Sequence, residues 1–433
     1  MNRTILPGLA ALVVLVFAAC EDDLPTSLDP DLFPVAPRSV ELRLPWSSFA
    51  GNLRVIGGYG APIELFHGIL ANDFEGTLDS RTLVRFADFP DTAFVLVEGS
   101  NVRSALSFTG GRVVARFDTV TSVHEGPVEV VANQLLSEWY PPSATWTVAV
   151  DTINDTRTWP VPGGGPVREL ATGEWDPESG DSLVLEVDSA AVASWGDTTD
   201  LARGLRLDVV DAGVRLRVNS VTLRLDAVPE VRTDTTIVQT STPDALGFIY
   251  DPVPEPPPDG MRIGGAPAWR TIIDVDVPAV LEGPESVCQR VECPFTLEPE
   301  RINAASLILK SRASPAAFQP TDTIRLDVRA VLSPDRLPKS PLGESFVGSP
   351  GRPVAPSAFG EDAGTEIAIP VTGFVRDIVR GETSLGEEPP GTMALLSFFE
   401  PLSISFASFA GPGGADEPYL RLIVTLSDTV DVR

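Results

Sequence analysis

Short runs in which apolar and polar residues alternate recur along almost the whole chain, and they constrain its fold more than any other feature. Examples are residues 40–44, 112–117, 182–187, 221–225 and 323–328. Alternation with a period of two, with charged residues at the polar positions, indicates β-strands that cover a core with one face. Helix-period stretches are nearly absent, and 36 Gly and 41 Pro punctuate the runs as turns do. The pattern predicts an all-β protein of antiparallel β-sandwich, jelly-roll-like type.

Six short segments of the first half recur, in the same order, in the second half. The pairs are 54–58 with 262–265, 81–86 with 270–275, 102–106 with 302–307, 187–195 with 371–379, 204–207 with 392–395, and 221–225 with 419–424. A shared order of this kind indicates two tandem copies of one frame whose loops differ in length.

The stretch between the copies is rich in Thr and ends in the proline cluster 252–258, a composition that predicts a semi-extended linker. Within it, residues 246–250 are a candidate opening strand of the second copy, as residues 40–44 are of the first. We therefore expect a first β-sandwich at 38–228, a linker at 229–258 and a second β-sandwich at 259–429.

Each copy is expected to contain one short helix. Thr372 is a candidate N-cap for a helix that stops at Gly381, and Asp188 or Ser189 is a candidate N-cap for a helix that ends near Trp195.

The N-terminus has the features of an export signal. Arg3 precedes the apolar run 9–17, which is short for a membrane span and ends at two alanines and Cys20. This arrangement resembles a bacterial lipoprotein signal peptide at 1–19, with Cys20 as the lipidated first residue of the mature chain; the alternative is an ordinary secretory signal with an incidental cysteine. Residues 20–37 then predict a flexible tether, and the expected location is the outer membrane or cell surface.

Charge and cysteine content bound the partners and the compartment. The formal net charge is −28, from 60 acidic and 32 basic residues, which disfavours nucleic acid as a partner. Cys288 and Cys293 follow Cys20, and their close spacing in an oxidising compartment predicts a disulfide. Free thiols and a metal site are the alternatives, but a metal site needs further soft ligands, while His67 and His124 lie in the other half of the chain.

Motifs for catalysis are missing from the sequence. It contains no Gly-x-Ser-x-Gly elbow, metalloprotease helix motif or phosphate-binding loop, and both histidines are expected on the surface or in loops. Asp274 and Asp276 share one face of an expected strand, and a glycosidase needs only such a pair; a solvated strand face is the competing interpretation. No cofactor is expected, with a structural calcium ion as the alternative, for which no ligands are assigned.

Aromatic residues offer the one candidate ligand site. A sugar-stacking platform is predicted at four residues in expected loops or strand edges: Trp139, Tyr140, Trp159 and Trp175. Packing in the core is the competing interpretation, and it is favoured for Trp146 and Trp195, which lie in repeat elements.

Several of these segments carry a family resemblance. Residues 139–146 (Trp-Tyr-Pro-Pro-Ser-Ala-Thr-Trp), the strand–helix segment that ends at Trp195, the pair Gly204-Leu205, and Pro418-Tyr-Leu in the second copy resemble the DNRLRE-type β-sandwich domain. That group is similar to carbohydrate-binding modules of secreted bacterial proteins. The resemblance covers both halves, although the second copy lacks the Thr-Trp element. It implies the fold, with binding or adhesion as the role, and it carries no ligand site across.

Together these features predict a non-catalytic lipoprotein that acts as a binding or structural module. Its expected partners are the membrane, through the lipid on Cys20, and a polysaccharide as the candidate ligand. The alternative is a secreted polysaccharide-active enzyme that uses an acidic residue pair.

Overall fold

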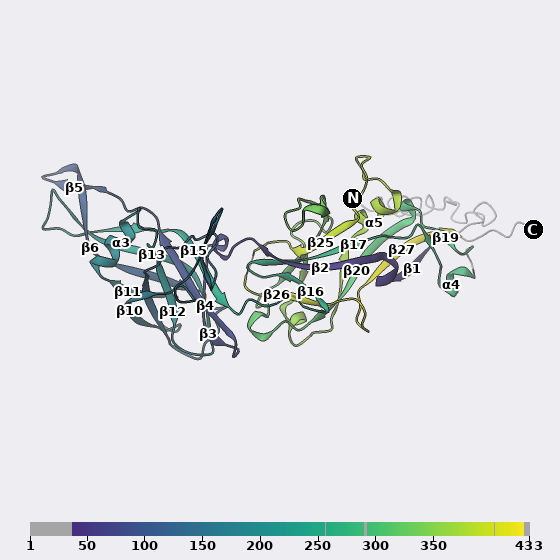
Figure 1. The fold of residues 1–433 in the computed structure, drawn as a ribbon, viewed down its shortest axis with the longest axis horizontal. Helices are drawn as coiled ribbons and strands as arrows, with labels where there is room; N and C mark the ends of the chain where they lie inside the picture. Colours follow the sequence, from purple (N-terminus) through teal and green to yellow (C-terminus); the bar gives the residue numbers. More distant parts are fainter. Residues whose placement is uncertain (1–36, 256, 290–291, 402, 428–433) are drawn as a thin grey trace, which may run out of the picture.

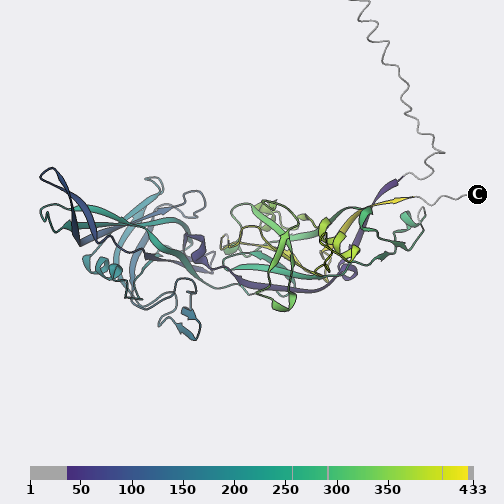
Figure 2. The same ribbon diagram turned by 90° about the horizontal axis from the view of Figure 1, so that it is seen from above.

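The computed structural model describes residues 37–427 apart from 256, 290–291 and 402, and this part of the chain is nearly all β (Figure 1). Its strands form two lobes that lie end to end along the long axis, an arrangement also visible from above (Figure 2). The sheets are antiparallel, which confirms the predicted all-β, sandwich-like class. None of the helices in the described segments is long and apolar enough to cross a bilayer. Cys20 lies outside the described residues.

The first lobe is built from residues 68–251. Its elements are β3 (Gly68–Phe74), β4 (Leu78–Phe86), β5 (Thr92–Val97), β6 (Ser100–Phe117), β7 (Val128–Leu135), β8 (Val148–Thr152), β9 (Asp155–Thr158), β10 (Val167–Trp175), β11 (Ser182–Val187), α3 (Ser189–Gly196), β12 (Leu205–Val209), β13 (Val214–Pro229), β14 (Ile237–Ser241) and β15 (Pro243–Asp251).

The second lobe contains β1, β2 and the described residues after 259. Its strands are β1 (Pro37–Pro45), β2 (Ala50–Tyr59), β16 (Gly260–Gly264), β17 (Ala268–Val275), β18 (Val280–Leu281), β19 (Phe295–Thr296), β20 (Ile302–Arg312), β21 (Ile324–Val331), β22 (Leu342–Ser345), β23 (Arg352–Val354), β24 (Glu366–Pro370), β25 (Thr392–Ser397), β26 (Phe406–Ala410) and β27 (Tyr419–Ser427). Its α-helices are α2 (Trp46–Phe49), α4 (Glu285–Cys288) and α5 (Thr372–Arg380), and short 3₁₀ turns occur at Pro299–Arg301, Ala316–Phe318, Pro334–Arg336 and Pro356–Phe359.

Both lobes have the same strand order in two layers. In the first lobe one layer runs β15-β4-β12-β7-β10 and the other β14-β13-β6-β11, while β3 pairs with both β4 and β13. In the second lobe the layers run β2-β17-β25-β21-β22 and β1-β27-β20-β24, linked by β16 and β26. The apolar faces of the two layers enclose one core in each lobe, as the alternating pattern requires.

The strand registers align the two lobes residue by residue. Leu207 lies opposite Thr82 in the first lobe as Leu395 lies opposite Thr271 in the second. Four of the six predicted repeat pairs occupy equivalent positions: 81–86 with 270–275, 187–195 with 371–379, 204–207 with 392–395, and 221–225 with 419–424.

The other two predicted repeat pairs are wrong in register. Residues 54–58 lie in β2, and their counterpart is the end of β15 rather than 262–265. Residues 102–106 lie in the long β5–β6 hairpin, whereas the segment of β6 that matches 302–307 starts near Phe108. Both errors arose because short apolar segments look alike, and only pairing identifies their neighbours.

The two lobes exchange their edge strands. β1 and β2 precede the first lobe in sequence, yet β1 pairs with β27 and β2 pairs with β17 in the second lobe. β14 and β15 precede the second lobe, yet they pair with β13 and β4 in the first lobe. Because the registers are equivalent, each strand pair takes the place that the other would fill in an unexchanged tandem repeat. We call this reciprocal arrangement the strand exchange.

The strand exchange places the lobe boundaries differently from the expected sandwiches at 38–228 and 259–429. Residues 37–59 belong to the second lobe, and half of the expected linker 229–258 is strand. The lobes are joined by two crossing segments, 60–67 and 252–259. The first of them contains a short 3₁₀ turn, Pro62–Leu65, which packs so closely on β15 that a Cβ atom at Gly247 would lie 2.8 Å from the Ile63 Cα. Glycine is therefore required at this crossing.

The two expected helices, α3 and α5, are present, while the one-turn helices α2 and α4 were not predicted. Asp188 caps α3, because its carboxylate accepts a hydrogen bond of 2.7 Å from the backbone N–H of Ala191. α5 ends at Gly381 in the left-handed region, with φ 78°. Its N-cap is Val371 rather than the expected Thr372, whose hydroxyl instead bonds the backbone of Ala305 in β20.

Cys288 and Cys293 form the predicted disulfide, with Cα atoms 5.4 Å apart. The bridge closes a loop between β18 and β19, in the insertion expected between β17 and β20. Gly283 packs directly against the two sulfur atoms, so that a Cβ there would come within about 3.0 Å of both. Val287 and Phe295 bury their side chains in the second core, which anchors this loop to the lobe.

An aromatic cluster joins the two lobes. Phe248 and Tyr250 of β15 contribute from the first lobe, and Phe318 and Phe406 from the second. Tyr250 and Phe318 place their ring centroids 6.2 Å apart, and Phe318 stacks on Phe406 at 5.5 Å. His67 extends the cluster, 6.0 Å from Phe248 and only 6% exposed. It lies in a loop, as one of its two expected positions has it, but not at the surface. These contacts make the junction a packed interface.

Candidate functional site

The predicted aromatic platform is not present as a surface. Trp139, Trp159 and Trp175 are each at most 3% exposed, and each indole N–H donates to a backbone carbonyl. Trp139 and Trp159 fold the β7–β10 connection onto the outer face of the first-lobe sheet, and Trp175 packs into the first core. Only Tyr140, 43% exposed, retains an accessible ring. Tryptophan's large apolar area favours burial, which explains why these rings are covered.

One member of the acidic pair proposed for an enzyme, Asp274, is held in structural contacts. Asp274 accepts hydrogen bonds from Arg54 at 2.8 Å and from Thr392 at 2.9 Å, so its carboxylate ties β2 and β25 to β17. Asp276 is exposed at the end of the strand. Within the described ranges, no group of three or more His, Cys, Asp or Glu side chains is placed to hold a metal ion.

A cavity of a size that could hold a small molecule lies between the lobes. It has a volume of about 520 Å³, within the range of small-molecule sites. Its walls are mostly apolar and include Ile56 of β2, Phe248 and Tyr250 of β15, Trp146 and Trp269. We call this cavity the junction pocket. Two of the exchanged strands, β2 and β15, contribute to the pocket, and neither lobe could form it alone.

Two indole rings from different lobes are positioned by close backbone packing. Trp269, at the start of β17, lies against Gly57 of β2, where a Cβ would be 3.0 Å from three ring atoms. Trp146 lies in the β7–β10 connection, against Gly163, which has φ 83° and where a Cβ would be 3.0 Å from the ring. Side chains at these glycines would displace the indoles, so both positions require glycine for the pocket.

A guanidinium group also packs against each indole ring. Arg81 lies 4.7 Å from the Trp146 ring centroid, and Arg262 lies 4.9 Å from that of Trp269. Burial lowers the pKa of both arginines from the ordinary value, although they stay charged at neutral pH. These cation–π contacts restrict the rotation of both indoles.

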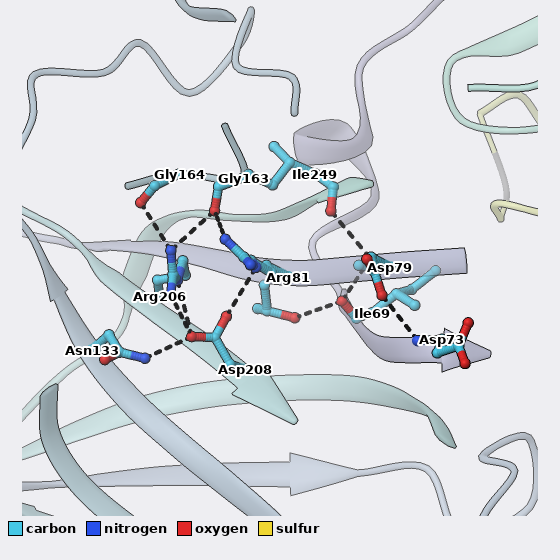
Figure 3. A network of polar contacts seen from close by, with 12 residues as sticks. Ile69, Asp73, Asp79, Arg81, Asn133, Gly163, Gly164, Arg206, Asp208 and Ile249 are labelled. Carbon is cyan, nitrogen blue, oxygen red and sulfur yellow. Dashed lines mark hydrogen bonds and ion pairs between the residues drawn. The ribbon is translucent and has the colours of Figure 1, made fainter. Parts of the chain in front are cut away.

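A polar network around Asp208, Arg81 and Arg206 lies behind Trp146, and Figure 3 shows its contacts. Asp208 of β12 accepts from Arg206 at 2.7 Å and from Asn133 at 2.6 Å, and it pairs with Arg81 at 3.4 Å. Both arginines donate to the Gly163 carbonyl, at 2.5 Å from Arg81 and 3.1 Å from Arg206.

The turn at Gly163 connects this polar network to the junction pocket. The Gly163 N–H donates to the Trp146 carbonyl at 2.7 Å, so the network reaches the indole through one backbone hydrogen bond. The Asp208 carboxylate pairs with both guanidiniums and so holds the network together.

The pocket offers no general acid or base. Among the described residues that line it, Tyr250 is the only one with a titratable side chain, and burial raises its pKa far above neutral. The walls instead suit a ligand with apolar faces.

Comparison of the chain with protein-family models, curated proteins and solved structures returned no match.

Sequence reasoning missed both indoles of the pocket. Trp146 was expected in the core, and Trp269 was the one tryptophan after the expected linker. A glycine-rich turn follows Trp146 at Gly163–Gly165, and another precedes Trp269 at Gly264-Gly265. These turns are the one local signal that the backbone approaches a ring closely. The strand exchange that brings the two rings to one cavity has no local signal.

Proposed function

We propose that this protein is a non-catalytic binding protein that holds a polysaccharide segment in the junction pocket. The observation that carries the proposal is that two indoles from different lobes line one apolar cavity of about 520 Å³. Pyranose rings present apolar C–H faces that pack on indoles, while their hydroxyls remain at the solvated mouth.

The lipid-anchored location belongs to the same proposal. The signal-like N-terminus and Cys20 support export and anchoring at the outer membrane or cell surface. The shared strand order of the lobes supports two copies of one domain. That this domain is of DNRLRE type rests on the sequence resemblance alone.

A glycan array probed with the purified full chain tests the ligand class, followed by titration of any glycan that binds. Trp146→Ala and Trp269→Ala should each weaken binding at least tenfold, since about 1.4 kcal/mol of lost ring contact suffices for that factor. Tyr140→Ala is the matched control, because this exposed ring belongs to the predicted platform and not to the pocket.

The outcomes separate the two sites. Weakening by the pocket variants alone, with circular dichroism spectra unchanged, supports the proposal. Weakening by Tyr140→Ala alone would move the site to the surface and refute the pocket, and release of product from a bound glycan would favour the enzyme alternative.

A further inference from the structure

A second, smaller cavity lies at the lobe junction, on the face shared by β3 and β13. Its volume is about 40 Å³. Arg215, Arg217, His67 and Thr121 line it from the first lobe, and hydroxyl side chains line it from the second, Ser403 and Ser405 among them. We call it the arginine pocket. It is distinct from the junction pocket, with which it shares no lining residue.

The arginine pocket concentrates positive charge in a chain of net charge −28. Arg215 is only 7% exposed, yet its contacts are the Ala317 carbonyl at 3.2 Å and the ring of Phe74 at 4.7 Å. Within the described part of the chain, neither Arg215 nor Arg217 has a carboxylate within ion-pair distance. A buried guanidinium without a counter-ion is costly, which makes this arrangement unusual.

Two carboxylates, those of Asp118 and Glu75, interact with the arginines electrostatically but form no ion pair with them. Asp118 interacts with Arg217 only at a distance, and its carboxylate accepts from the backbone N–H groups of Val120 and Thr121 at 2.9 and 3.0 Å. Glu75 acts on Arg215 only through a longer-range charge interaction. His67 adds no positive charge at neutral pH, because burial and Arg217 lower its pKa to about 4.

One donor in this lining has no partner. The Arg217 Nε–H is buried and makes no hydrogen bond within the described part of the protein. Buried donors are almost always satisfied, so an orphaned guanidinium N–H in this small cavity points to a group that completes it. Guanidinium and hydroxyl donors converging without a carboxylate are suited to an oxyanion, which accepts several charge-assisted hydrogen bonds.

We infer that the arginine pocket binds a small oxyanion that links the two lobes. The cavity holds roughly three water positions at about 10–15 Å³ each, the space that a carboxylate or a compact inorganic oxyanion displaces. Arg215 and Arg217 come from the first lobe and the serine hydroxyls from the second, so a bound oxyanion stabilises the contact between lobes. This inference stands independently of polysaccharide binding in the junction pocket.

Thermal unfolding of the purified full chain tests the inference, with sodium phosphate, sodium sulfate or sodium glucuronate titrated at constant ionic strength against sodium chloride. We expect a saturable rise of several degrees in Tm with at least one of these anions. Arg217→Gln should abolish the rise, since this partly exposed side chain can be replaced without emptying a core. Arg224→Gln is the matched control, because Arg224 is exposed on the same strand and should respond like the wild type.

The anions separate two sources of the same chemistry. Saturation by phosphate or sulfate indicates a free inorganic anion, and saturation by glucuronate alone indicates the acid group of a sugar. No saturable shift with any of the three, or an equal shift in Arg217→Gln, would overturn the inference.

Discussion

Arg54 and Asp274 lie 220 positions apart in sequence, and their side chains form an ion pair of 2.8 Å across two adjacent strands. Arg54 belongs to β2, which precedes the first lobe, and Asp274 belongs to β17 of the second. The pair is partly exposed and contributes at most about 1 kcal/mol by itself. The ion pair identifies β2 as an edge strand that precedes one repeat and pairs with the other.

The strand exchange predicts that cutting one connection will not separate the lobes. A protease site inserted in the loop 252–259 should give two fragments that co-elute in native size-exclusion chromatography, since β1 and β2 remain paired with β27 and β17. Denaturant should then separate them. Clean separation under native conditions would instead indicate two unexchanged sandwiches.

Asp208→Asn should destabilise the first lobe by about 2–4 kcal/mol. The change leaves Arg206 and Arg81, whose side chains are 10% and 30% exposed, without their counter-ion. Asp181→Asn is the matched control, because its ion pair with Arg116 is half exposed and should contribute less than about 1 kcal/mol. Urea unfolding measures the destabilisation that each variant causes. Equal destabilisation would mean that the network around Asp208 contributes no more than an exposed ion pair.

His67 should make stability pH-dependent in a defined window. Its pKa is about 4 in the folded chain and 6.5 as the reference, so above pH 6.5 it is neutral in both states and costs nothing. Between pH 6.5 and about 4 the unfolded chain takes up a proton that the folded chain does not, and about 3 kcal/mol is lost progressively.

His67→Gln should remove this loss, because a neutral amide does not titrate. The measurement compares urea unfolding of variant and wild type between pH 7.5 and 4, in buffer free of phosphate and sulfate. Parallel profiles for the two proteins would show that His67 titrates normally.

Reduction of the Cys288–Cys293 bridge should loosen its loop without unfolding the second lobe. The ring is short, so the bridge should contribute less than the ~3 kcal/mol expected for a 15-residue loop, and Val287 and Phe295 still anchor the segment. Hydrogen exchange should rise in the loop alone after reduction. Alkylation without reductant, followed by mass spectrometry, checks the bridge itself, and two alkylated cysteines in exported protein would disprove it.

Cys20→Ser tests the proposed anchor. Without the thiol no lipid can be attached, so the variant should accumulate as uncleaved precursor or leave the membrane fraction. Detergent partitioning of both proteins gives the comparison. Unchanged tight membrane association would exclude Cys20 as the anchor.

The fold class was predictable because alternation reports directly on which face of a strand is buried. The partner of each strand was not, since 246–250 and 53–57 present similar apolar edges and fit equivalent registers in either lobe. The expected exposure of Trp139 and Trp159 was wrong for a related reason. Trp139 and Trp159 lie among prolines and polar residues that suggest exposed loops, yet the long β7–β10 connection folds them onto the sheet. Local composition indicates a loop, and only tertiary packing shows what the loop covers.

Pairing the first strand with the last also bears on how the chain is made. β1 leaves the ribosome first, but β27, its partner, arrives only when the rest of the second lobe has followed. The second lobe therefore cannot close until β27 has been synthesised, and such long-range pairing is expected to be slow and dependent on protection of exposed strand edges. A prematurely terminated chain would keep β1 and β2 uncovered. The exchange thus makes an intact C-terminus a condition for hiding the N-terminal strands from proteases and from other chains.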